Sequence, residues 1–156
     1  ALAFIPSAKS RREKEEIGRM LIAGSVCFGI IGGLVCVLLP SMAPQLLTLD
    51  RALWPAMHSL MLPAFCCMVL VGADVAVSGI LLAENQVAYL ARAMVVNLAV
   101  TSVYLFTKGR SGSLPAVWWG LVIFFFCRAS QGIARIVVMS RQKVSDENLT
   151  ENYEGA

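Results

Sequence analysis

Residues 60–82 read LMLPAFCCMVLVGADVAVSGILL and contain one charged side chain, Asp74. A bilayer core is about 30 Å thick, so an α-helix needs about 20 predominantly apolar residues to cross it. This stretch meets both requirements, because its one ionisable residue is surrounded by aliphatic and small side chains. The sequence therefore predicts a transmembrane helix over these residues.

Three other stretches have a similar length and character. The four predicted spans are residues 20–39, 60–82, 87–106 and 114–136. The whole chain is 58% hydrophobic and only 15% charged, whereas ordinary globular domains have about 25% charged residues. So little polar surface argues against a water-soluble domain. We therefore predict an all-α membrane protein with four transmembrane helices.

Lys and Arg are distributed unevenly around these spans. Seven of them lie just before the first span or after the last, and the two loops that face the opposite side hold three. Because positive charge accumulates on the cytoplasmic side, we expect both termini in the cytosol or its organellar equivalent. Residues 1–19 would then be a cytosolic basic segment, and residues 137–156 a polar cytosolic tail, loose after Arg141. The membrane could be the plasma membrane, the vacuole or the plastid envelope.

Several functional classes lack support in the sequence. The five cysteines lie in apolar runs without a CxxC pair, and His58 is the single histidine, so we expect no metal site. No P-loop, GxSxG, HExxH or GxGxxG motif is present, so we expect neither an enzyme nor a cofactor. The basic residues form no patch over a whole domain, so nucleic acid is not an expected partner. The expected surroundings are the lipid bilayer.

Asp74 is the most informative polar residue, because it lies about 12 Å from the nearer end of its predicted span at 1.5 Å per residue. A carboxylate at this depth costs roughly 2.5–3.5 kcal/mol on insertion scales. Ser78 follows one turn later on the same face. Two interpretations remain open. The two side chains could hold a coupling ion, H⁺ or Na⁺, or Asp74 could have only a structural role, paired with an arginine or lining an inert water-filled crevice.

Two further polar sets lie inside the apolar runs. Asn97, Thr101 and Tyr104 form a stripe that either lines a solute cavity or bonds to neighbouring helices. The residues Arg128, Gln131 and Arg135 are spaced by three and four positions and share one helix face. That face should meet protein or water rather than lipid.

Small residues recur at helical spacing in the first two predicted spans. Gly29 and Gly33 form a GxxxG pattern, and Gly72 and Ala76 form a second small-xxx-small pair. Such pairs let helix backbones approach closely in membranes. Close packing is the plain interpretation, and a hinge in a moving transporter is the alternative.

Three stretches together resemble a known family. They are Ala3-Phe4-Ile5-Pro6 with the basic residues after it, HSLMLPAFCCMVLVGADVAVSGILLA at 58–83, and LPAVWWGLVIFFFCRASQGIARI at 114–136. Their order is similar to the C-terminal part of multidrug and toxic compound extrusion (MATE) transporters, especially the plant and algal branches. Some plant relatives have an acidic residue at the position of Ser78, whereas this chain has Asp74 one turn earlier.

The resemblance implies that the chain is a fragment holding the last four of twelve transmembrane helices. It also implies a secondary active transporter that exports small organic solutes in exchange for protons or sodium, by alternating access between two lobes. The remaining helices of the full-length transporter would be partners of this chain.

Two other functions stay open. One is a complete four-helix exporter that works as a dimer, although such exporters usually have their essential carboxylate in the first helix, and residues 20–39 contain none. The other is a non-transporting membrane scaffold subunit, in which the buried polar residues serve assembly.

Overall fold

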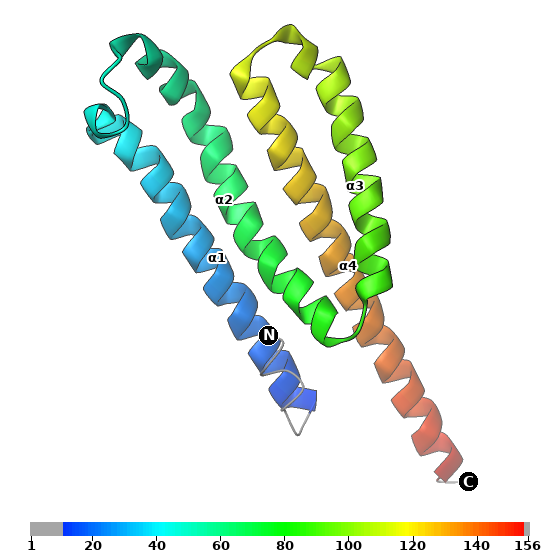
Figure 1. Ribbon diagram of the computed structural model, residues 1–156. Coiled ribbons are helices and arrows are strands. Elements are labelled where there is room, and N and C mark those ends of the chain that lie inside the picture. Colours follow the sequence, from blue (N-terminus) through cyan, green and yellow to red (C-terminus); the bar gives the residue numbers. More distant parts are fainter. Residues whose placement is uncertain (1–10, 155–156) are drawn as a thin grey trace.

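The computed structural model describes residues 11–154 and consists of four long helices joined by short links (Figure 1). The helices are α1 (Arg11–Met42), α2 (Trp54–Ala83), α3 (Val87–Thr107) and α4 (Leu114–Glu154). No strand occurs among the described residues. The predicted all-α architecture with four long apolar helices is thus confirmed. Residues 1–10 of the predicted basic segment and the last two residues of the predicted tail lie outside the described residues.

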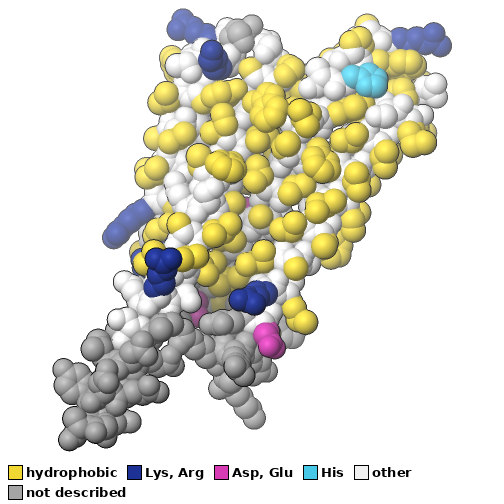
Figure 2. All heavy atoms as spheres, turned by 180° about the vertical axis from the view of Figure 1, so that it is seen from behind, with side chains coloured by type: hydrophobic (Ala, Val, Ile, Leu, Met, Phe, Trp, Pro, Cys, Tyr) yellow, Lys and Arg dark blue, Asp and Glu magenta, His cyan; other side chains and the backbone are white. Residues whose placement is uncertain are grey.

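Each helix, in the case of α2 together with the short turn before it, provides a segment long and apolar enough to cross a membrane. These segments are Glu16–Met42, Arg51–Ala83, Val87–Thr107 and Leu114–Gln142. At most 28% of the residues in the most apolar window of any of them are buried inside the molecule. Hydrophobic side chains accordingly cover the middle of the face shown in Figure 2. So much exposed apolar surface suits lipid rather than water, and the chain is a multi-pass membrane protein.

The four helices run alternately up and down (Figure 1). α2 packs against α1 on one side and against α4 on another, and α3 packs mainly against α4. The order across the molecule is therefore α1, α2, α4, α3. The α1–α2 and α3–α4 loops lie at one end, and the α2–α3 link lies at the other end, where α1 begins and α4 ends.

The helices extend beyond the predicted spans. α1 begins at Arg11 instead of residue 20, α2 begins at Trp54 instead of residue 60, and α4 continues past residue 136. The expectation of a loose tail after Arg141 was wrong, because α4 remains helical to Glu154. Extending an existing helix is far easier than nucleating one, and neither Gly nor Pro interrupts the sequence between Gly132 and Gly155.

Short capping interactions shape the links. Between α1 and α2 the chain forms two 3₁₀ turns, Pro44–Leu46 and Arg51–Leu53. The Asp50 carboxylate accepts a hydrogen bond of 2.9 Å from the Ala52 backbone N–H, which satisfies a donor that the turn itself leaves unpaired. In the α2–α3 link, Asn85 has φ +59°, a left-handed conformation that Asn tolerates better than most residues.

Glycines set the contact between α1 and α2. A Cβ atom on Gly29 would lie 2.7 Å from the Met68 carbonyl oxygen, and one on Gly33 would lie 2.7 Å from Cδ2 of Phe65. A Cβ atom on Gly72 would collide with the Ser25 carbonyl oxygen. All three glycines of the two predicted small-residue pairs thus lie where the two backbones cross, and Ala76 is buried one turn further along α2.

Candidate functional site

An ion pair joins α2 to α4 within the membrane-spanning region. Nε of Arg128 lies 2.7 Å from Oδ1 of Asp74. Ser78 completes a triangle: its hydroxyl donates to Oδ1 of Asp74 at 3.3 Å, and Nη2 of Arg128 donates to its Oγ at 3.3 Å. Asp74 is 6% exposed. These three residues are called the charge triangle below.

The charge triangle answers one question that the sequence leaves open. Asp74 does pair with an arginine, and that arginine is Arg128. A carboxylate removed from water is stable only when a positive charge and hydrogen bonds compensate for its lost hydration. Coupling-ion exchange at Asp74 and Ser78 stays a prediction.

The Arg128 guanidinium also reaches α3. Its Nη1 lies 2.6 Å from Sδ of Met94, although a thioether sulfur is only a weak acceptor. One side chain of α4 therefore contacts both α2 and α3, and the charge triangle is positioned by three helices. A change in the charge of Asp74 would consequently alter the contacts of Arg128 with both α2 and α3.

A second polar contact joins α3 to α4. Nε2 of Gln131 donates to Oδ1 of Asn97 at 2.9 Å, and Asn97 is completely buried. Nδ2 of Asn97, Oε1 of Gln131 and Oγ1 of Thr101 are buried without a hydrogen-bond partner. Tyr104 lies further along α3, where its ring faces Gly120 of α4. Asn97 thus bonds to a neighbouring helix, which is one of the two roles considered for the stripe.

The third polar contact lies at the end of the molecule that carries the α2–α3 link. Nη2 and Nε of Arg135 donate to Oε1 of Gln86 at 2.9 and 3.3 Å. The Arg135 guanidinium also lies over the ring of Tyr89, with its Cζ 5.2 Å from the ring centroid. Arg128, Gln131 and Arg135 therefore all contact protein, and each has a different partner.

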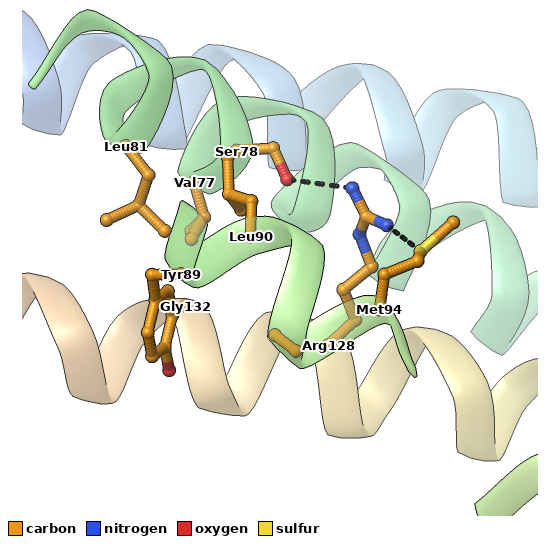
Figure 3. A pocket seen from close by; sticks show the side chains of 9 residues that line it. Val77, Ser78, Leu81, Tyr89, Leu90, Met94, Arg128 and Gly132 are labelled. Atoms are coloured by element: carbon orange, nitrogen blue, oxygen red, sulfur yellow. Dashed lines mark hydrogen bonds between the residues drawn. The ribbon is translucent and has the colours of Figure 1, made fainter. Parts of the chain in front are cut away.

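A small cavity of about 10 Å³ lies beside the charge triangle (Figure 3). Its polar wall consists of Ser78, Tyr89 and Arg128. Its apolar wall is formed by side chains of α2 and α3 and by Gly132 of α4. These residues are Val77, Leu81, Leu90, Ala93, Met94 and Gly132. None of the predicted cavity residues Asn97, Thr101 and Tyr104 lines it.

Sequence reasoning missed four residues of this region: Gln86, Tyr89, Met94 and Gly132. Gly132 carries the clearest signal, since a glycine inside a membrane span often marks close helix contact. A Cβ atom there would collide with Val77 of α2. Gln86 lies in a link and Met94 resembles any other apolar residue of a span, so the sequence offers no signal for either.

The chemistry available here is that of one carboxylate opposite one guanidinium. Among the described residues, no group of three or more His, Cys, Asp or Glu lies close enough to hold a metal ion. A carboxylate can in general bind a proton or a small cation, and here either would compete with the contact to Arg128. Both processes would change the charge of a buried site and hence its packing.

Comparisons with known proteins identified no relative of this chain. No protein-family model matches the chain, and neither a curated protein nor a solved structure matches it.

Proposed function

We propose that this chain is part of a secondary active transporter that exports organic compounds by antiport with protons or sodium ions. The observation that carries the proposal is the charge triangle, an ion pair held between two membrane-spanning helices. Ionisable residues within membrane spans are rare, costly and commonly found on ion pathways. No hydrolytic or phosphoryl-transfer motif suggests another source of energy.

In this mechanism Asp74 has two states. When it is ionised, Arg128 and Ser78 satisfy its carboxylate, and α2 is tied to α4. When it takes up a proton, the attraction between α2 and α4 falls and Arg128 is left with an uncompensated charge, which favours a different packing of these helices. Sodium could produce the same change by displacing the guanidinium from the carboxylate. Each state would expose the solute site to one side of the membrane.

The glycine contact between α1 and α2 supports such a movement. Gly29 and Gly72 bring the two backbones together with no side chain of their own between them. A seam of this kind allows sliding at lower cost than an interdigitated one, so α2 could shift against α1 when its bond to α4 weakens.

At the family level, we propose that the chain supplies the last four helices of a twelve-helix MATE-type transporter. The support is the sequence resemblance of residues 1–136, together with four apolar helices in alternating directions. Eight further helices would complete the solute cavity, and both termini would lie in the cytosol or its organellar equivalent. The plasma membrane, the vacuole and the plastid envelope all suit this arrangement.

The test is solute flux in reconstituted vesicles. The full-length protein, purified into liposomes, should export a fluorescent organic cation when a proton or sodium gradient is imposed. The two gradients are applied separately, so that the coupling ion is identified. Asp74→Asn should abolish gradient-driven export while leaving the protein folded. Equal export by wild type and Asp74→Asn would remove Asp74 from the mechanism.

One observation favours a second candidate, a membrane scaffold. The polar side chains Asp74, Asn97 and Gln86 all find partners within the four helices, as they would in a purely structural unit. A scaffold would show no flux under either gradient, whereas the proposed transporter would show flux under one.

A further inference from the structure

We propose that the cavity between α2, α3 and α4 is a water site that connects the charge triangle with the α2–α3 end of the molecule, and that Tyr89 closes this connection. The proposal deepens the proposed function, since the water would carry protons to Asp74. Only the role of the water as a proton carrier rests on that function. Whether the site is hydrated can be measured without transport.

The cavity has the size and the polarity that a water molecule needs. Its volume of about 10 Å³ is close to the minimum that holds one water. The Arg128 guanidinium has five N–H donors, of which three donate to Asp74, Ser78 and Met94. Arg128 and Ser78 both line the cavity (Figure 3), so the two remaining N–H groups of Arg128 and a lone pair of the Ser78 Oγ are the groups that would bond a water molecule there.

Water in this cavity would be in immediate contact with the ion pair. Arg128 and Ser78 line the cavity, and both bond directly to Asp74. A proton arriving on a cavity water therefore needs two linked transfers to reach the carboxylate: the water gives a proton to Oγ of Ser78, and the Ser78 O–H proton passes to Oδ1 of Asp74. The Ser78 hydroxyl is thereby restored, so no other reactant is required.

Tyr89 lies between this cavity and the end of the molecule. It belongs to the first turn of α3, whereas Met94 lies about 8 Å deeper along the same helix at 1.5 Å per residue. The Tyr89 ring lines the cavity and also lies beneath Arg135. Arg135 in turn bonds Gln86 of the link. Polar contacts thus lead from the link through Arg135 to Tyr89, and Tyr89 and Arg128 both line the cavity.

Two contacts hold Tyr89 in its closing position. Its hydroxyl donates to the backbone carbonyl oxygen of Gln131 at 2.8 Å, and its ring receives the cation–π contact of Arg135. Both contacts can break without loss of a helix hydrogen bond, because on the Tyr89 side they involve only its hydroxyl and ring. Rotation of Tyr89 would then open the cavity toward Arg135 and the link.

The experiment is X-ray hydroxyl-radical footprinting of the protein in lipid nanodiscs, in which radiolysed water oxidises the side chains it touches. The reporter is Met94, which lines the cavity, and the matched control is Met68, which does not. Their exposed fractions are similar, 46% and 42%. We expect Met94 to be oxidised several-fold faster than Met68. Equal rates would overturn the water site.

The gate has its own variants. Tyr89→Ala should raise the Met94 oxidation rate several-fold further, and Tyr89→Phe should raise it less, because the ring remains while the bond to Gln131 is lost. Tyr104→Leu, on the same helix but away from the cavity, should leave the rate unchanged. An unchanged Met94 rate in folded Tyr89→Ala and Tyr89→Phe would overturn the gate. Solute flux with a dry Met94 would refute this proposal alone, and a hydrated Met94 without flux would refute only the transport function.

Discussion

Arg128 and Asp74 are 54 residues apart in the chain, and yet their Nε and Oδ1 atoms lie 2.7 Å apart, across the contact between α4 and α2. This contact joins the second and fourth helices directly, with α3 packed mainly on α4. The two charges therefore report on the main helix contact between the α1–α2 hairpin and the α3–α4 hairpin.

Removal of one member of this pair should destabilise the protein more than removal of both. Asp74→Leu or Arg128→Leu leaves a charge in the membrane interior without its partner, and we expect each to lower the free energy of unfolding by about 3 kcal/mol. The double variant Asp74→Leu/Arg128→Leu should recover most of this loss. Unfolding in mixed detergent micelles, read by circular dichroism, measures all three. Near-wild-type stability in both single variants would contradict the ion pair.

Glycine-to-alanine substitutions should show whether a glycine matters for the close contact between α1 and α2 or only through its low helix propensity. Gly29→Ala and Gly72→Ala place a Cβ atom against the backbone of the opposite helix, and we expect a loss of about 1–3 kcal/mol in unfolding free energy for each. The control is Gly24→Ala in α1, where nothing lies within 4 Å of the added atom. It should be neutral or stabilising, because Ala favours a helix over Gly. A neutral Gly72→Ala would refute the close approach of α1 and α2.

The amide contact between Asn97 and Gln131 should be worth less than the ion pair. Asn97→Leu leaves the Gln131 side chain without its acceptor, and the expected loss is about 1 kcal/mol, as for other hydrogen bonds between membrane helices. A double-mutant cycle with Gln131→Leu measures the coupling through the same unfolding assay. Strictly additive effects of the two substitutions would show that the amides do not interact.

Hydropathy predicted the fold well because each span is a predominantly apolar run of about bilayer length with few charged residues. The helix ends were predicted less well, since hydropathy marks the part of a helix inside lipid and not where its hydrogen bonding stops. α2 begins at Trp54 because a 3₁₀ turn leads directly into it. α4 continues to Glu154 because no residue in its polar part breaks a helix.

The sequence identified individual polar residues of the site, but it did not predict which of them contact one another. Asp74 and Arg128 both stand out as charges in apolar runs, and the sequence does not tell which helices pack together. The same gap hid Tyr89, whose contacts come from α4 and not from its own helix. Such contacts depend on the α2–α4 and α3–α4 crossings, which leave no periodic trace in one sequence.

The most direct test of the central claim replaces the ion pair by a neutral pair of similar shape. In Asp74→Asn/Arg128→Gln the side chains can still hydrogen-bond across α2 and α4, but no group at the site can ionise. We expect the variant to fold with near-wild-type stability and to lose export driven by the coupling gradient. Gradient-driven export at the wild-type rate would contradict the claim and leave the pair a purely structural role.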